Sequence, residues 1–319
     1  MSASQTALRR ALLYVPGSSQ KMLKKVQELT ADCIAYDLED SVTPGRKEEA
    51  RSNIRHSLEQ SRPAGIRECA VRINAVASGF ASNDLAAVVN APNLDSIVVP
   101  KVNSPSDLHW VADFINHHRT YRSPRESGPR PIKILALIES AKAIANLHEI
   151  CQTVRSQLDG LIFAAEDFAL DLSLTRTPSL TEFLYARSAI VTACRAHELP
   201  SVIDLVCTEY KGKEGRRAMQ DECHGGKRLG FNGKQCIHPD QVEIAHKLFA
   251  PSEKELAWAV RVVVADQKAD TQGRGSWTLD GKMIDVPVVK KANSLVTKAE
   301  ACGIKVDKIR AQWKDQEPE

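Results

Sequence analysis

Acidic side chains follow several short apolar segments of the sequence, and their types and positions predict a cation site. Asp40, Glu139 and Asp167 each come after such a segment, and Glu166 adjoins Asp167. Like charges gathered at one place repel one another unless a cation lies between them. Carboxylate oxygens favour Mg²⁺, with Mn²⁺ as the substitute, and Mg²⁺ takes one or two of them beside water or substrate oxygens. We expect Glu139 and Asp167 to be the metal ligands and keep Asp40 and Glu166 as secondary candidates. The alternative is that these acids cap the helices that follow.

Arg72 is the one cation of the segment 69–73, which we expect to end beside these acids. Its guanidinium fork suits bidentate binding of a substrate carboxylate. The alternative is a structural ion pair with Asp40 or Glu39. Lys101 is a weaker candidate for a Schiff-base lysine, because nearby acids would keep it charged.

The elements that must position these side chains are eight apolar, β-branched segments that alternate with helical patterns. The segments are 11–15, 33–38, 69–73, 96–99, 133–138, 159–164, 201–206 and 228–231. Helix starts are marked by capping residues such as Ser18, Ser140 and the Ser252–Glu255 capping box. Eight alternations favour an α/β fold of the TIM (β/α)₈ barrel type, whose active site lies at the carboxyl ends of the strands. An open doubly wound sheet is the alternative, but no G-x-G-x-x-G motif follows the first segment.

The pattern changes in the last part of the chain, which predicts a C-terminal helical arm. We expect a barrel catalytic domain over residues 9–265 and an arm of loop and helix over 266–305. A charged, disordered tail is expected over 306–319.

Composition and charge exclude several classes of protein. The 43 basic and 40 acidic residues give a formal net charge of only +3 and are mixed along the chain. This argues against a nucleic-acid partner or a membrane surface. No apolar run approaches the roughly 18 residues that cross a bilayer. The eight cysteines form no C-x-x-C pair, which is typical of buried, reduced thiols in an intracellular protein.

Seven motifs appear in order along nearly the whole chain, and together they carry a family resemblance. They are Arg10-x-x-Leu13-Tyr14-Val15-Pro16-Gly17, Asp37-Leu38-Glu39-Asp40, Val71-Arg72-Ile73-Asn74, Val99-Pro100-Lys101, Ile138-Glu139-Ser140-Ala141, Ala165-Glu166-Asp167-Phe168 and Gly230-Phe231-Asn232-Gly233-Lys234-Gln235-x-Ile237-His238-Pro239. The chain resembles the citrate lyase β-subunit-like family of HpcH/HpaI aldolases. The segment Met283-Ile284-Asp285-x-Pro287 makes it most similar to the branch that cleaves citramalyl-CoA.

The resemblance implies roles for individual residues. It assigns the Mg²⁺ ligands to Glu139 and Asp167 and a substrate contact to Arg72. Asp285 matches a catalytic acid on the arm that enters a neighbouring subunit of a homotrimer. The positions that match binding sites for CoA are Tyr14, Lys21, Lys25, Ile237 and His238.

The expected reaction is Mg²⁺-dependent cleavage of a 3-hydroxyacyl-CoA. Citramalyl-CoA would give acetyl-CoA and pyruvate, and malyl-CoA would give acetyl-CoA and glyoxylate. The alternatives are a malate synthase-type condensing thioesterase, a citryl-thioester lyase and a CoA-ester-binding scaffold without activity. The resemblance places the protein in mitochondria, whereas the short N-terminal segment favours the cytoplasm.

Overall fold

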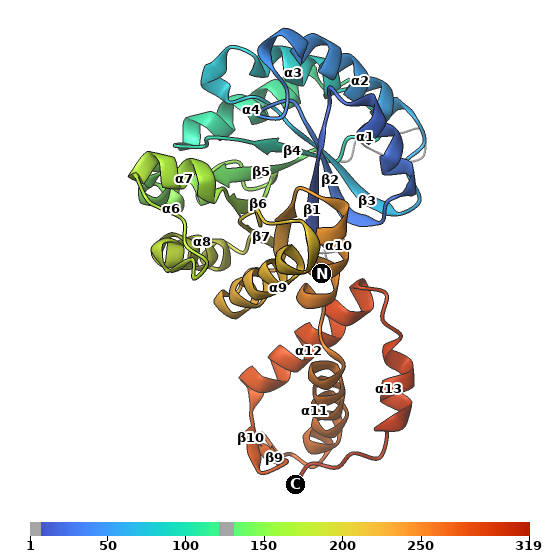
Figure 1. Ribbon diagram of the computed structural model, residues 1–319. Coiled ribbons are helices and arrows are strands. Elements are labelled where there is room, and N and C mark those ends of the chain that lie inside the picture. The colour runs from blue at the N-terminus through green and yellow to red at the C-terminus, as the bar shows by residue number, and fades with distance from the viewer. Residues whose placement is uncertain (1–7, 121–130) are drawn as a thin grey trace. The chain divides into compact units, whose positions relative to one another are not determined.

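Eight parallel strands close into a barrel in the computed structural model, which describes residues 8–120 and 131–319. Each strand pairs with the next along the chain, and the last pairs with the first (Figure 1). This topology confirms the predicted TIM barrel. The strands are β1 (Ala11–Pro16), β2 (Ala31–Asp37), β3 (Ile66–Arg72), β4 (Ser96–Val99), β5 (Lys133–Ile138), β6 (Leu158–Phe163), β7 (Ser201–Asp204) and β8 (Gly233–Cys236).

Helices surround the strands, and their starts follow local sequence signals. Ser104 and Asp107 form a capping box at α4, with Pro105 at the first helical position. Ser140 caps α5 by accepting a hydrogen bond from the Ala143 amide. The helices of the barrel are α1 (Gln20–Lys25), α2 (Lys47–Glu59), α3 (Ala81–Val88), α4 (Pro105–His118), α5 (Ala141–Ala145), α6 (Leu147–Gln152), α7 (Ala165–Leu172), α8 (Leu184–Ala196), α9 (Gly212–Leu229) and α10 (Pro239–Phe249).

The barrel interior is filled by small and branched apolar side chains. Buried residues of seven strands form one cluster, and Tyr14 packs against it. The cluster is Leu12, Cys33, Ala35, Ala70, Val98, Leu135, Leu137, Ile162 and Ile203. Because side chains alternate along a strand, Leu12 and Tyr14 point into the barrel and Leu13 points outward.

The eighth strand lies at Gly233–Cys236, so the prediction of 228–231 is wrong. The apolar residues of that segment belong to the end of α9 and its cap, where Gly230 has φ 104°. The true strand carries Lys234 and Gln235, and all four of its residues are buried. A Cβ on Gly233 would lie 2.0 Å from the Arg9 carbonyl oxygen, so glycine permits the close approach of β8 to β1. A polar strand of this kind has no apolar signature.

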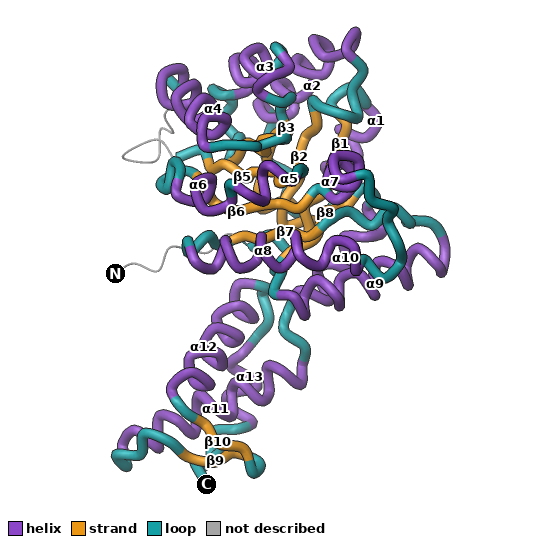
Figure 2. Tube along the Cα trace, turned by 90° about the vertical axis from the view of Figure 1, so that its left-hand side faces the viewer, coloured by secondary structure: helices purple, strands orange, loops and turns teal. Residues whose placement is uncertain are grey.

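Residues Lys247–Glu319 form a second compact unit, separate from Met1–His246. In it α11 (Glu253–Thr271) packs against α12 (Val286–Ala301) and α13 (Val306–Gln312), as Figure 2 shows. Its core includes Leu256, Val260, Ala292, Val296 and Val306. The capping box of Ser252 and Glu255 is confirmed at the start of α11.

The organisation of this unit differs from the expected one. The boundary falls at 246/247 rather than after 265, because the apolar face of α11 packs on α12 and α13. Within the expected loop, the hairpin of β9 (Trp277–Leu279) and β10 (Lys282–Ile284) turns at Asp280 and Gly281, an Asp-Gly pair that suits a tight hairpin. The tail is not disordered as predicted: it contains α13, and Glu319 exchanges backbone hydrogen bonds with Thr278 at 3.0 and 3.1 Å.

None of the eight cysteines, all of which lie within the described residues, forms a disulfide, and seven of them are buried. Burial raises the pKa of Cys69, Cys151 and Cys223 to about 12. Among the described helices, none combines the length and the apolar character needed to cross a membrane.

Candidate active site

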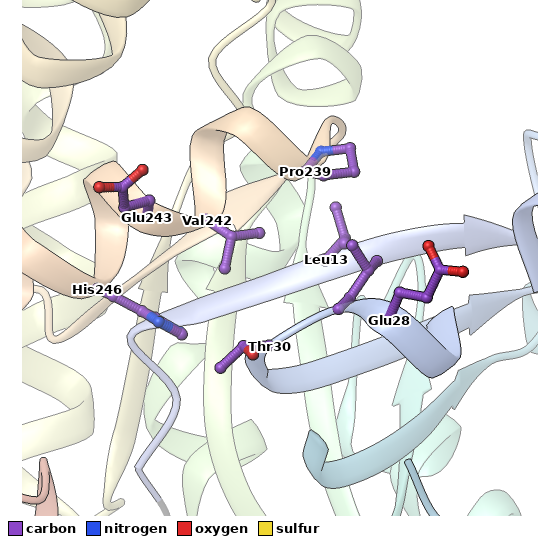
Figure 3. A pocket seen from close by; sticks show the side chains of 8 residues that line it. Leu13, Glu28, Thr30, Pro239, Val242, Glu243 and His246 are labelled. Carbon is purple, nitrogen blue, oxygen red and sulfur yellow. The ribbon is translucent and has the colours of Figure 1, made fainter. Parts of the chain in front are cut away.

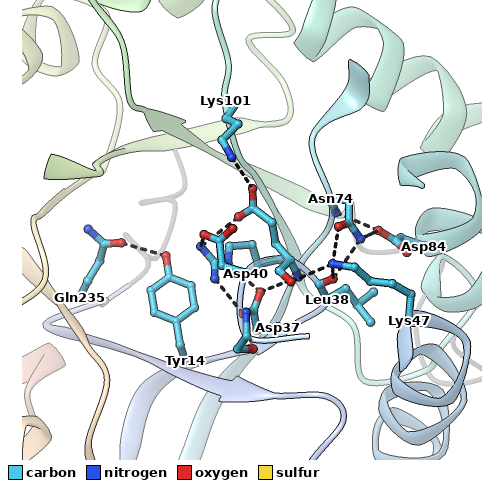
Figure 4. A network of polar contacts seen from close by, with 12 residues as sticks. Tyr14, Asp37, Leu38, Asp40, Lys47, Asn74, Asp84, Lys101 and Gln235 are labelled. Atoms are coloured by element: carbon cyan, nitrogen blue, oxygen red, sulfur yellow. Dashed lines mark hydrogen bonds and ion pairs between the residues drawn. The ribbon is translucent and has the colours of Figure 1, made fainter. Parts of the chain in front are cut away.

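Arg72 contacts three acids at the carboxyl ends of β2 and β3, two of which, Asp37 and Asp40, are labelled in Figure 4. Its Nε and Nη2 atoms donate to the two carboxylate oxygens of Asp37 at 2.7 and 2.8 Å. Its Nη1 atom lies 3.0 Å from Glu39 and 3.5 Å from Asp40. The structural ion pair with Glu39 and Asp40 is therefore present, and the bidentate partner is a further acid, Asp37.

Asp37 is fully buried and is held as an anion. Its carboxylate accepts hydrogen bonds from the Glu39 amide at 2.9 Å and from the amide and hydroxyl of Ser41. Burial opposes ionisation, but the Arg72 guanidinium and these hydrogen bonds outweigh it and lower the pKa of Asp37. Asp37 thus fixes two of the guanidinium nitrogens, and the third points toward Glu39 and Asp40.

Lys101 connects Glu39 with the carboxylate that follows β6. Its Nζ atom lies 3.5 Å from Glu39 and 3.9 Å from Asp167. The residue has φ 52°, a left-handed conformation that is uncommon for a long side chain and frequent at functional sites. Burial opposes its charge, but Glu39 and Asp167 outweigh it and raise the pKa of Lys101. A charged ammonium is unsuited to Schiff-base chemistry, as expected.

Glu139 carries a carboxylate oxygen with no partner. Its residue is 5% exposed, and Oε2 has no hydrogen bond within the described part of the chain. Burial, followed by the charges of Glu39 and Asp167, raises the pKa of Glu139 to about 8. Burial and the charges of Asp40 and Asp37 likewise raise the pKa of Glu39 to about 7 against the opposing charges of Arg72 and Lys101. An unpaired buried carboxylate costs free energy unless it gains a partner.

These features fit a divalent cation. Glu139 offers a free oxygen, and Asp167, whose side chain is 37% exposed, lies close enough to influence its pKa. Over residues 8–120 and 131–319, no group of three or more His, Cys, Asp or Glu side chains is arranged to hold a metal. A pair of carboxylates is what Mg²⁺ takes when water and substrate fill the other positions.

Tyr14 lies beside Arg72 inside the barrel. The Arg72 guanidinium lies over the Tyr14 ring, 4.6 Å from its centroid. The Tyr14 hydroxyl donates to Gln235 at 2.9 Å (Figure 4). Gln235 in turn donates to the carbonyls of Phe163 and Asp204, so Tyr14 connects Arg72 with β8.

The other predicted residues have different surroundings. Lys21 and Lys25 are exposed on α1, four residues apart. After β8, Ile237 is exposed and His238 is half-buried, and the His238 ring stacks on Tyr210 with centroids 5.2 Å apart. Asp285 belongs to the second unit, where it accepts a hydrogen bond from the Val288 amide at the start of α12. Glu166 does not join the cluster, because Arg176 binds its carboxylate.

Asp37 and Gln235 have site contacts that sequence reasoning did not assign. The run Asp37-Leu38-Glu39-Asp40 signalled an acidic strand end but not which acid would bind Arg72. Gln235 gave no signal, because a glutamine in a short polar segment is typical of a loop.

A pocket of about 300 Å³ lies elsewhere, on the outside of the barrel between β1 and α10 (Figure 3). Its lining contains none of the predicted site residues. It is lined by Leu13, Glu28, Leu29, Thr30, Pro239, Val242, Glu243 and His246.

The chain is similar to several known proteins. The family model of HpcH/HpaI aldolase/citrate lyase matches residues 10–239. The human mitochondrial citramalyl-CoA lyase is 34% identical over 299 residues, which cover 91% of this chain and 85% of the relative. The (3S)-malyl-CoA thioesterase of Cereibacter sphaeroides is 34% identical over 292 residues, which cover 92% and 95%.

One of the similar solved structures contains bound ligands. The protein CitE of Mycobacterium tuberculosis, in complex with magnesium, acetoacetate and coenzyme A, superposes with a TM-score of 0.72 at 25% identity. The match covers 92% of this chain and 99% of that one.

Proposed function

Because the chain belongs to the HpcH/HpaI aldolase/citrate lyase family and is a carbon–carbon lyase, we propose that it cleaves a 3-hydroxyacyl-CoA in a Mg²⁺-dependent reaction. The preferred substrate is citramalyl-CoA, cleaved to acetyl-CoA and pyruvate, and the alternative is malyl-CoA, cleaved to acetyl-CoA and glyoxylate. The observation that carries the proposal is the buried, unpartnered oxygen of Glu139 beside Asp167 and Glu39.

Glu139 and Asp167 would hold Mg²⁺, for which Mn²⁺ can substitute. When bound, the metal would supply Lewis-acid stabilisation of negative charge on the substrate. Glu139 would bind the cation as a carboxylate anion. The bound cation would remove the free-energy cost of a buried, unpaired charge. Asp40 remains a secondary candidate through its contact with Arg72.

Arg72 would stabilise negative charge on the reacting part of the substrate. Asp37 fixes two of its nitrogens, so the guanidinium is oriented before substrate arrives. The Nη1 atom, now beside Glu39, is the donor available to a substrate carboxylate or to the acetyl-CoA enolate. The Tyr14 ring supports the face of the guanidinium.

Asp285, from a neighbouring subunit of a homotrimer, would donate a proton to the enolate carbon during cleavage. The apolar side chains near it support a covered surface: Met283 is 69% exposed and Val286 is 57% exposed in the single chain. The hydrogen bond from the Val288 amide orients the Asp285 carboxylate at the start of α12.

CoA would bind along the exposed residues near the barrel mouth. Lys21 and Lys25 share one face of α1 and suit phosphate groups. Ile237 and His238, with Tyr14 at the inner end, would line the remainder. We place the reaction inside the cell, in mitochondria by analogy with the human relative or in the cytoplasm.

Three rival functions are separable from the proposed one. The Cereibacter relative is a malyl-CoA thioesterase, so hydrolysis of the thioester is the second candidate. It releases free CoA, whereas lyase chemistry leaves acetyl-CoA intact. A citryl-thioester lyase would cleave citryl-CoA instead, and a scaffold would bind CoA esters without turnover.

The test uses purified full-length protein with citramalyl-CoA, malyl-CoA or citryl-CoA, in Mg²⁺ or in EDTA. We expect Mg²⁺-dependent release of acetyl-CoA with an equivalent of keto acid, fastest with citramalyl-CoA. Release of free CoA would favour the thioesterase, and binding without turnover would favour the scaffold.

A further inference from the structure

A chain of ion-paired side chains runs from the buried Lys234 of β8 to the exposed Glu166 in the first turn of α7, outside the cluster around Arg72. Lys234 is fully buried and donates to Glu222 of α9 at 2.7 Å. Glu222 also accepts from Arg176 at 2.7 Å, and Arg176 donates to the Val206 carbonyl at 3.0 Å. The last member is Glu166, which forms an ion pair with Arg176 Nη1. Lys234 and Arg176 thus both bind Glu222, and Arg176 links Glu222 to the Glu166 carboxylate of α7.

The loop after α7 is built to return Arg176 to the first turn of that helix. Ser173 ends the helix with φ 55°, and the Leu174 amide donates back to the Ala169 carbonyl at 2.8 Å. The amide and hydroxyl of Thr177 both donate to Glu182, at 2.6 and 2.8 Å. Arg176 lies between these two fixed points, and its side chain is 17% exposed.

The first turn of α7 needs such support. Ala164 occupies the N-cap, and its methyl group cannot accept hydrogen bonds from the helix amides. Phe168 anchors the inner face against Phe163, with centroids 5.4 Å apart, and Asp171 accepts from the Ala141 amide at 2.8 Å. The Glu166–Arg176 pair adds a link between this first turn and the loop that follows the helix.

Glu166 and Asp167 are adjacent carboxylates with different surroundings. Glu166 is bound by Arg176, whereas Asp167 has Lys101 at 3.9 Å as its ion-pair partner within residues 8–120 and 131–319. We propose that Arg176 is a positioning residue for the metal site: it holds Glu166 against Glu222 and Val206 and so leaves Asp167 to bind the cation beside Glu139. This inference rests on the proposed function, in which Asp167 is a metal ligand.

The direction of the change in metal affinity on removing Arg176 distinguishes a positioning role from a purely electrostatic one. Arg176 brings a positive charge near a cation site, so by charge alone its removal would tighten metal binding. If Arg176 positions the first turn, its removal frees Glu166 and displaces Asp167, and metal binding weakens. Loss of a partner that orients a metal ligand typically weakens affinity by about 10–100-fold.

The experiment measures metal binding directly. Full-length protein is freed of metal and titrated with Mn²⁺ while the electron paramagnetic resonance signal of the free ion is followed, with Mg²⁺ as competitor. Arg176→Gln should raise the dissociation constant about 10–100-fold. Arg176→Lys, which keeps the charge but loses the fork, should lie between that variant and wild type and serves if the glutamine variant does not fold.

Arg62→Gln is the matched control. Arg62 also binds a carboxylate, Asp95, at 2.7 Å and the Asn93 carbonyl, but at the amino-terminal ends of β3 and β4. It should lose stability without a change in metal affinity. If wild type binds Mn²⁺ and both Arg176 variants bind it equally or more tightly, the positioning role is refuted and the proposed function stands. If wild type binds neither cation, both fall.

Discussion

Replacing Glu139 with glutamine should stabilise the metal-free protein while removing its response to Mg²⁺. Burial and the neighbouring acids raise the pKa of Glu139 from an ordinary 4.5 to about 8. In the unfolded chain the carboxyl ionises near 4.5, so the folded state favours the protonated form. Its contribution to stability is therefore complete below pH 4.5 and is lost as the pH rises toward 8.

The magnitude follows from the same pKa values. At 1.36 kcal/mol per pKa unit, the span from 4.5 to pH 7 corresponds to about 3 kcal/mol of destabilisation. At pH 5 the corresponding loss is about 1 kcal/mol. Glu139→Gln keeps the shape and removes the charge, so its stability advantage in EDTA should grow between these two pH values. Adding Mg²⁺ should stabilise the wild type by mass action and leave the variant unchanged.

The assay is urea unfolding at pH 5, 7 and 8, in EDTA and in excess Mg²⁺, followed by circular dichroism. Glu149→Gln, at an exposed position of α6, is the control and should change little under every condition. The reasoning is refuted if Glu139→Gln is less stable than wild type in EDTA at pH 7. A constant difference between the two proteins across the pH range would refute it equally.

Three further predictions concern other parts of the chain. Asp285→Asn should slow turnover of citramalyl-CoA while CoA binding and the melting temperature stay near wild type, and an unchanged rate would remove Asp285 from the chemistry. Asp37→Asn should lower the rate by about 10–100-fold with a smaller change in KM, because Arg72 loses the charge that orients it, and steady-state kinetics at saturating Mg²⁺ measure this. The wild type should lose stability below pH 6.5, because burial lowers the pKa of His246 and the unfolded chain therefore binds a proton more readily than the folded one. His246→Gln should abolish this loss. Melting temperatures from pH 5 to 8 test the last of these, with His56→Gln on the exposed face of α2 as the control.

Most of the barrel is predictable from the sequence because seven strands contain buried apolar residues. Residues 33–36 of β2 and 134–138 of β5 are continuous apolar runs, as is typical of parallel strands buried on both sides. The eighth strand is polar although it is buried. Its Lys234 side chain donates a hydrogen bond to Glu222, and Gln235 donates to the Phe163 and Asp204 carbonyls. A buried polar strand depends on partners that are distant in the sequence, and composition does not reveal them.

The candidate site, like the barrel, is predictable only in part. The strand-end acids are visible in the sequence, but the pairing of Asp37 with Arg72 follows from the register of β2 on β3, in which the two residues are direct partners. The left-handed conformation of Lys101, which directs its ammonium toward Glu39 and Asp167, has no signal in a Val-Pro-Lys segment. Residue types are thus predictable at the strand ends, whereas their partners depend on register and backbone geometry.

The distribution of cysteines allows opening of the barrel to be followed by thiol labelling. The seven buried thiols all belong to residues 1–246, and the partly exposed Cys302 belongs to residues 247–319. An alkylating reagent under native conditions should therefore add one mass increment, on the second unit alone. Each further increment in a mass spectrum would record a barrel molecule that had opened, so pulse labelling can follow the unfolding of the barrel without any engineered probe.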